Sequence, residues 1–303
     1  MTGRAETLVG ISLVPEANAW PRLVDAAREA DQGGLDLIGI QDHPYQWRFV
    51  DTFVLIGHLL AGTERIRIFP DVANLPLRPP ATLAKAANSL DRLSGGRFEL
   101  GLGAGSFWDA IVAMGGPRRT PREALAALAE AIDLIRLMWS GDRSVTYEGE
   151  HYRVRGVHPG EPPPHPIGIW VGGYGPRMLR LIGRVADGWI PSYGMTSPEA
   201  LRSGNSRIDE AARAAGRDPA AVRRLLNIGG SITAPGPADR RAPERSVGRI
   251  RSDLAGPPAY WGKLLDDFRD MGFDAFVLWL PDDDPAQVAR LAHEVAPLVR
   301  STS

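Results

Sequence analysis

The chain has 303 residues, of which 44% are hydrophobic and 23% are charged, a composition typical of a soluble globular protein. The formal net charge of -1 gives no electrostatic reason to expect a nucleic acid or an anionic membrane as a partner. No stretch approaches the ~20 apolar residues that span a bilayer, and no signal-peptide core is present, so a cytoplasmic location is expected. Cysteine is absent, which excludes disulfides, thiolate catalysis and cysteine metal ligands.

Strand and helix patterns alternate along the chain. The strands are expected at residues 7–13, 35–40, 66–69, 98–102, 167–171, 187–191, 225–232 and 275–280. The helices are expected at residues 20–31, 49–61, 80–93, 121–139, 176–185, 198–215, 258–271 and 285–299. Eight such pairs in 303 residues predict an α/β fold of the (β/α)8 TIM-barrel type, with residues 1–303 as a single domain. A doubly wound sheet is the alternative.

Two segments depart from this alternation. Residues 144–147 and 151–154 have the pattern of a β-hairpin, inserted before the fifth strand. Residues 234–257, after the seventh strand, are rich in Pro, Gly, Arg and Asp, so a long mobile loop is expected there. Elsewhere the local signals are sharper: Thr120 and Glu123 are spaced as a capping box at the start of a helix.

A glycine-rich turn follows the fifth strand. Gly172, Gly173 and Gly175 allow a sharp turn and a close approach of the backbone to a ligand, and Pro176 suits the first position of a helix. Free N–H groups at a helix start favour an anion, which makes this turn a candidate phosphate site. On its own, the turn is equally compatible with simple chain reversal.

In a TIM barrel, active-site residues lie at the carboxyl ends of the strands. Asp42 and His43 follow the second strand, residues 71–74 the third, and residues 103–106 the fourth. His43 is the natural candidate for proton transfer, because imidazole titrates near neutral pH.

Several of these segments together are similar to a known family. They are residues 35–43, 74–80, 90–97, 101–105, 172–178 and 186–189. With them the chain resembles the bacterial luciferase-like family of flavin- and deazaflavin-dependent oxidoreductases over essentially its whole length. The resemblance implies a barrel with reduced flavin or coenzyme F420 across the strand ends. It also implies a non-proline cis peptide after the third strand, expected at Asp71–Val72, with the bulge behind the cofactor ring.

By the same resemblance, His43 is the expected catalytic residue, as a base or as the group that orients substrate. The expected cofactor-binding residues are Asp42, Asp71, Val72, Ala73, Asn74, Gly103, Ala104, Gly105, Ser106, Gly172, Gly173, Tyr174, Gly175, Pro176, Arg177 and Met178. The cofactor phosphate is expected on residues 173–178. A small-molecule substrate and a homodimer, often formed through the second and third helices, are also implied.

The similarity is greatest to the deazaflavin branch of the family, which favours F420-dependent hydride transfer to or from a small organic substrate. The sugar-phosphate dehydrogenases of this branch carry a glutamate where this chain has Ser106, so glucose 6-phosphate is not the expected substrate. An FMN-dependent monooxygenase that uses oxygen is the first alternative. A flavin-binding protein without catalytic activity is the second.

Structural roles are the competing interpretation of the same residues. Asp42 and His43 also suit a strand-end pair, and Ser106 also suits a helix cap. Arg177 and Arg180 either reach the phosphate or only solvate a helix face. Trp108, Trp170 and Trp189 are expected mainly as core or wall residues. His151, His158 and His165 lack a carboxylate motif beside them, so no metal site is expected.

Overall fold

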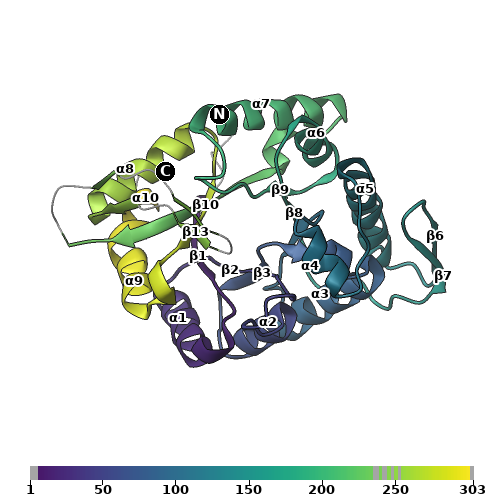
Figure 1. The fold of residues 1–303 in the computed structure, drawn as a ribbon, viewed down its shortest axis with the longest axis horizontal. Coiled ribbons are helices and arrows are strands. Elements are labelled where there is room, and N and C mark those ends of the chain that lie inside the picture. The colour runs from purple at the N-terminus through teal and green to yellow at the C-terminus, as the bar shows by residue number, and fades with distance from the viewer. Residues whose placement is uncertain (1–5, 235–238, 241–243, 247–248, 252–253, 301–303) are drawn as a thin grey trace.

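In a computed structural model the chain forms a ring of helices around parallel strands (Figure 1). The structure describes residues 6–234, 239–240, 244–246, 249–251 and 254–300. The central strands, in spatial order, are β3 (Arg67–Pro70), β2 (Leu37–Ile40), β1 (Leu8–Leu13), β15 (Ala275–Trp279), β10 (Arg223–Ile232), β9 (Gly188–Trp189), β8 (Ile169–Gly172), β5 (Leu100–Gly103) and β4 (Ala73–Asn74). All neighbouring pairs in this order are parallel.

The sheet closes on itself where a parallel bridge joins Ile68 of β3 to Phe98, just before β5. β3 and β4 form one barrel strand that is interrupted between Asp71 and Val72, where the peptide bond is cis, as expected. Counted in this way the barrel has eight strands, which confirms the TIM-barrel prediction and excludes the doubly wound sheet.

The helices form the outer ring. They are α1 (Trp20–Gln32), α2 (Thr52–Ala61), α3 (Pro80–Ser94), α4 (Trp108–Ala113), α5 (Pro121–Met138), α6 (Pro176–Val185), α7 (Pro198–Ala214), α8 (Pro258–Asp270), α9 (Pro285–Arg290) and α10 (Ala296–Arg300), with the π-helical turn Leu291–Val295 between the last two. In the parts of the chain that the structure describes, no helix combines the length and apolar character needed to cross a bilayer.

Local capping signals set several helix starts. The predicted box at α5 is present: the Thr120 hydroxyl accepts the Glu123 N–H, and the Glu123 carboxylate accepts the Thr120 N–H at 2.7 Å. The α2 helix begins at Thr52, three residues later than predicted. The reason is Asp51, whose carboxylate accepts the N–H groups of Phe53 and Val54 and so fixes the first turn.

The hairpin before the fifth barrel strand consists of β6 (Val145–Glu148) and β7 (Arg153–Val157), which pair antiparallel. It projects beyond α5 at the edge of the ring (Figure 1). The Glu130 carboxylate of α5 accepts the N–H groups of residues 150–152 at 2.9–3.1 Å. This side chain therefore satisfies the backbone of the hairpin turn and ties it to the helix.

The prediction of a mobile loop at residues 234–257 is wrong for the part of this segment that the structure describes. It contains the short strands β11 (Asp239–Arg240), β12 (Glu244–Ser246), β13 (Arg249–Arg251) and β14 (Leu254–Gly256). β14 pairs parallel with the end of β10 and antiparallel with β11, and β12 pairs with β13. β10 runs past its barrel neighbours, so its last residues offer unpaired backbone groups that β14 satisfies. The intervening residues lie outside the described part.

Apolar side chains fill both sides of the sheet. Inside the barrel the core consists of Leu8, Leu37, Phe69, Trp170, Ile190, Leu225, Ala275 and Val277. A larger core lies between the strands and the ring of helices. Because strand side chains alternate between the two faces, the next inward positions toward the carboxyl ends include Ser12, Asp71 and Asn227. The interior is thus apolar at depth and becomes polar at the mouth.

Candidate active site at the mouth of the barrel

Val72 forms an apolar wall at the mouth of the barrel. It follows the cis peptide, and its methyl groups lie against glycines of β5 and β8. A Cβ atom added to Gly103 would lie 2.7 Å from a Val72 methyl carbon, and one added to Gly172 would lie 3.1 Å away. Glycine is therefore required beside this wall, because any side chain there would displace Val72.

A polar chain crosses the mouth below this wall. The Trp279 indole donates to Asn227 Oδ1 at 3.2 Å, and Asn227 Nδ2 donates to Asp71 Oδ1 at 3.1 Å. Burial raises the pKa of the Asp71 carboxyl to about 6, although the hydrogen bond from Asn227 opposes the rise. A carboxyl group in the middle of the mouth is thus poised to change protonation near neutral pH.

Three buried polar atoms at strand ends have no hydrogen-bond partner among the described residues. They are Ser12 Oγ on β1, Asp71 Oδ2 after β3 and Asn74 Oδ1 on β4. Buried polar groups in native proteins are nearly always bonded, so such atoms at the carboxyl ends of the strands indicate a place for a polar ligand. Two of the three, Asp71 and Asn74, are among the residues that the sequence assigned to a cofactor.

Asp42 connects the end of β2 to the chain that follows the cis peptide. Its buried carboxylate accepts both Arg78 Nε and Nη2 at 2.6 Å and the Asn74 N–H at 2.8 Å. Arg78 in turn donates to Asp51 at 2.8 Å. With these three hydrogen bonds the carboxylate holds the chain after the cis peptide, so Asp42 acts as a positioning residue.

His43 lies at the rim of the mouth, half-buried between two aromatic rings. Its Nδ1 is 2.7 Å from the hydroxyl of Tyr45, and the Phe107 ring meets it edge-on at a centroid distance of 5.6 Å. Burial lowers the pKa of His43, and the negative charge of Asp42 opposes this only in part. His43 is therefore neutral at pH 7, with no partner for Nε2 in the described chain, which leaves that atom free to exchange a proton.

The glycine-rich loop is held from β9 and the residues that follow it. The Trp189 indole donates to the Gly173 carbonyl at 2.9 Å, and the Ser192 N–H donates to the Tyr174 hydroxyl at 2.7 Å. Gly175 has φ 84° and ψ 155°, a conformation almost confined to glycine, and directs the chain into α6 with Pro176 at its first position. The loop is thus fixed in shape before any ligand arrives.

The loop after β5 lies beside this site. Gly105 has φ 95°, and a Cβ atom there would lie 2.6 Å from Pro76, so this glycine is needed for the close packing of two mouth loops. Ala104 is half-buried and Ser106 is exposed. The alternative role of Ser106 as a helix cap is wrong, because α4 is preceded by Phe107 and lacks a side-chain cap.

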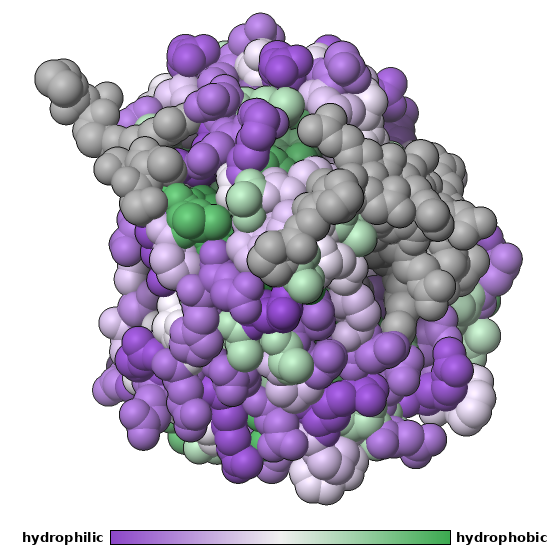
Figure 2. Space-filling view, turned by 90° about the vertical axis from the view of Figure 1, so that its left-hand side faces the viewer, coloured by the Kyte–Doolittle hydropathy of each residue, from purple (hydrophilic) through white to green (hydrophobic). Residues whose placement is uncertain are grey.

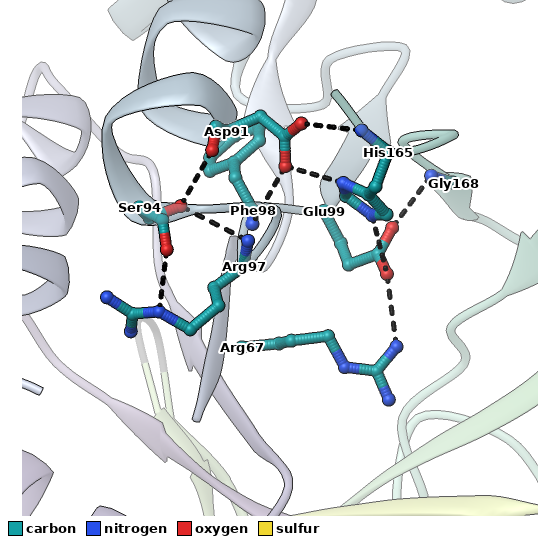
Figure 3. A network of polar contacts seen from close by, with 8 residues as sticks. All are labelled: Arg67, Asp91, Ser94, Arg97, Phe98, Glu99, His165 and Gly168. Atoms are coloured by element: carbon teal, nitrogen blue, oxygen red, sulfur yellow. Dashed lines mark hydrogen bonds and ion pairs between the residues drawn. The ribbon is translucent and has the colours of Figure 1, made fainter. Parts of the chain in front are cut away.

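The structural interpretation is confirmed for two of the tryptophans. Trp170 and Trp189 are buried core residues, and Trp189 in addition holds the glycine-rich loop. His165 lies between two buried carboxylates that the sequence did not indicate: its Nδ1 is 2.6 Å from Asp91, and its Nε2 faces Glu99 at 3.6 Å (Figure 3). The described residues contain no group of three side chains able to hold a metal ion.

A family model described as luciferase-like monooxygenase matches residues 5–243. The chain belongs to this luciferase-like family. It is 32% identical to an F420-dependent glucose-6-phosphate dehydrogenase of Kineococcus radiotolerans over 73% of this chain and 66% of that protein, just under two thirds of its length. A protein of the same description from Intrasporangium calvum is 30% identical over 88% of this chain and 90% of its own length.

Solved structures share the luciferase-like fold. An F420-dependent secondary alcohol dehydrogenase, in complex with an F420–acetone adduct, superposes with a TM-score of 0.83 at 19% identity, over 97% of this chain and 99% of that chain. A coenzyme F420-dependent tetrahydromethanopterin reductase of Methanopyrus kandleri gives a TM-score of 0.81 at 19% identity, over the same shares. A type II Baeyer–Villiger monooxygenase of Pseudomonas putida, in complex with FMN, gives a TM-score of 0.77 at 19% identity, over 96% of this chain and 98% of that chain.

Several mouth residues of this luciferase-like chain were not predicted. Asn227 could have been found, because it is the one polar residue in an apolar run and has the inward parity of Leu225. Ser12 is likewise a single polar residue among the apolar residues of β1. Tyr45 and Arg78 had no such signal, since their roles depend on contacts with residues that are distant in sequence or lie in irregular loops.

Proposed function

We propose that this luciferase-like protein is an oxidoreductase that uses coenzyme F420 to transfer a hydride to or from a small organic substrate. The observation that carries the proposal is the Val72 wall, which stands over the glycines of β5 and β8 at the mouth of the barrel. A flat ring fits against such a wall. The F420-dependent activities named for the relatives support the same cofactor.

The residues at the mouth suit this group. We propose that the ring lies against Val72, with Asn74 and the backbone of residues 103–105 around it. The unpartnered atoms Ser12 Oγ and Asn74 Oδ1 would complete their hydrogen bonds with its polar edge. The phosphate would lie on the N–H groups at the start of α6, next to Gly173 and Gly175. When bound, the deazaflavin supplies the hydride donor or acceptor.

His43 is the proposed acid–base group. Its neutral imidazole takes the proton of a substrate hydroxyl at Nε2 as a hydride leaves the adjacent carbon, and returns the proton in the reverse reaction. Tyr45 fixes the ring through Nδ1, and burial and the charge of Asp42 raise the pKa of Tyr45, so the phenol stays protonated. Phe107 closes the other side of the ring and limits access of water.

The substrate is proposed to be a small organic molecule other than glucose 6-phosphate. Ser106 is exposed where the sugar-phosphate dehydrogenases of the family carry a glutamate, so no carboxylic acid is available at that position. The partly exposed Phe107 ring packs against His43, and Trp47, four residues further along the same loop, is 88% exposed. These side chains favour an apolar alcohol, ketone or imine over a sugar phosphate.

An FMN-dependent monooxygenase is the second candidate, supported by the shared fold of the FMN-bound monooxygenase. The discriminating experiment is fluorescence titration of the apoprotein with F420 and with FMN. Micromolar binding of F420 and much weaker binding of FMN is the expected result. The reverse preference would reject the F420 proposal. Binding without hydride exchange toward any alcohol, ketone, imine or enone would instead indicate a non-catalytic flavin-binding protein.

The first prediction concerns His43. His43→Ala is expected to lower kcat by roughly 100-fold or more, because general acid–base catalysis contributes about that much, while the F420 Kd changes little. His43→Gln, which keeps a hydrogen-bonding group beside Tyr45, serves as the control for packing and should be equally slow. Steady-state kinetics and the same titration measure both quantities. Turnover of the Ala variant at the wild-type rate would exclude the proposed role.

We also propose a homodimer that forms through α2 and α3. Val54 on α2 is 72% exposed and Leu93 on α3 is 86% exposed, although both are large apolar residues. The two helices pack side by side, with Leu90 of α3 against Gly57 of α2. Exposed apolar residues on adjacent helices support a protein–protein contact on this face.

A further inference from the structure

A second concave feature lies on the outside of the barrel, between α5, α6 and α7, with a volume of about 530 Å³. Arg122 on α5 and Arg177, Arg180 and Arg184 on α6 line it, and we call it the arginine groove. The three α6 arginines stand at positions i, i+3 and i+7, so they lie in a row along one face of the helix. The groove therefore extends along α6 from its first turn toward its C-terminal end.

The positive charge of the groove is not compensated by neighbours. All four arginines are exposed, and in the described chain none of them has a carboxylate within ion-pair distance. Nearby arginines are paired: Arg136 contacts Asp187 at 2.9 Å and Arg217 contacts it at 3.5 Å. Four unpaired charges along one groove create a positive potential that attracts an anionic ligand.

Between the arginines the surface is made of small apolar side chains. Ala126 and Ala129 of α5 and Ala214 of α7 line the groove together with Leu181 of α6. Such a floor accommodates a narrow chain whose methylene groups lie on the alanines while its charges meet the guanidinium groups. The occupant that matches is a flexible chain with regularly spaced carboxylates.

The groove is continuous with the proposed phosphate site. Arg177 is the second residue of α6, directly after Gly175 and Pro176 of the glycine-rich loop. Arg184 lies about 10 Å further along the helix axis. In coenzyme F420 the phosphate carries a lactyl group followed by a chain of glutamates, each with a free carboxylate. We propose that the arginine groove binds this glutamyl tail. The assignment rests on the proposed function, because FMN ends at its phosphate.

The test compares two forms of the cofactor: F420 whose tail has no glutamate and F420 with a long glutamyl tail. Both are titrated into the apoprotein at low salt, and deazaflavin fluorescence reports the Kd. The wild-type protein is expected to bind the long-tailed form roughly 3–10-fold more tightly, as several exposed ion pairs provide. The advantage should shrink at high salt, because these contacts are screened. Equal affinities would overturn the proposal.

The matched variants remove two charges each. Arg180→Gln/Arg184→Gln should lose the preference for the long tail and bind the tail-free form as the wild type does. Arg22→Gln/Arg28→Gln on α1 is the control, and it should retain the preference. If the groove variant instead keeps the preference but shifts the monomer–dimer equilibrium in sedimentation, the groove is a contact between copies and the assignment is wrong. If neither form of F420 binds while FMN does, the proposed function itself fails.

Discussion

Asp71 is the residue whose chemistry at the mouth is most sensitive to pH. One carboxylate oxygen accepts from Asn227, and the other is buried without a partner. Burial raises its pKa from 3.8 to about 6, so the group resists ionisation in the folded protein. A raised carboxyl pKa means that its contribution to folding is fully present below about pH 4 and is lost as the pH rises through about 6.

Replacing Asp71 by Asn should therefore stabilise the protein at high pH. At pH 8 the free energy of unfolding of Asp71→Asn is expected to exceed that of the wild type by roughly 1–3 kcal/mol, because Asn needs no charge in the buried site. The difference should vanish near pH 4. Urea denaturation at a series of pH values measures it.

Asp42→Asn is the matched control, since the same change is made at a buried carboxylate that is fully bonded. Here the charge is paired with Arg78, so the variant is expected to be less stable by about 3 kcal/mol. If Asp71→Asn instead lowered the free energy of unfolding at pH 8 to the same degree, the ionised Asp71 carboxylate would have to be stabilised in the folded protein. The described residues offer no such contact to its second oxygen, so this result would contradict the raised pKa.

At the scale of elements, one network ties α3 to the amino ends of β5 and β8 (Figure 3). Asp91 at the end of α3 contacts His165 Nδ1 at 2.6 Å, and Glu99 faces Nε2 while it accepts the Gly168 N–H at 2.7 Å. The Glu99 carboxylate raises the pKa of His165, burial opposes this, and the charge of Asp91 adds to the rise. The His165 ring between two carboxylates thus links three elements.

This network predicts a stability that falls with rising pH. Because the pKa of His165 is raised above its ordinary 6.5, its contribution is complete below that pH and is lost as the pH rises through the higher folded value. The stability difference between wild type and His165→Gln should thus be larger at pH 6 than at pH 9. With Glu99→Gln in both proteins, most of this trend should disappear. A difference that stays constant with pH would contradict the assignment.

The glycine-rich loop gives a second prediction at the same scale. Gly175→Ala is expected to cost about 1–3 kcal/mol, because φ 84° with ψ 155° is strained for any other residue, although open space surrounds the position. Gly216→Ala at the end of α7, with φ 71° and equally open surroundings, should cost about 1 kcal/mol. Only Gly175→Ala should weaken F420 binding, by roughly 10-fold or more. Equal cofactor affinity in both variants would remove the loop from the site.

At the scale of the whole molecule, the features that were predicted correctly from the sequence are those that local residue patterns determine. The barrel follows from eight repeats of strand and helix, and the start of α5 follows from Thr120 and Glu123, which lie within one turn. The strands within 234–257 were missed, because β14 exists only through pairing with β10, and composition does not report such long-range contacts. The pairing of Asp42 with Arg78 was not predicted, since the two residues are 36 positions apart in the sequence.

The faces of the molecule differ in the apolar side chains that they expose. On the side of α8 and α9, the surface drawn in colour is mainly hydrophilic, with apolar residues in small separate patches (Figure 2). Val54 and Leu93, by contrast, are among the most exposed large apolar residues of the described chain, and they stand on neighbouring helices. The face formed by α2 and α3 is therefore the better surface for a second copy.

The double variant Val54→Glu/Leu93→Glu is accordingly expected to be monomeric under conditions in which the wild type is a dimer, because two buried carboxylates per copy are costly in an interface. Val112→Glu on α4, which also places a charge at an exposed valine, is the control and should remain dimeric. Sedimentation velocity at micromolar concentration measures both, and circular dichroism verifies that the fold is retained. A folded double variant that sediments as the wild-type dimer does would place the interface elsewhere.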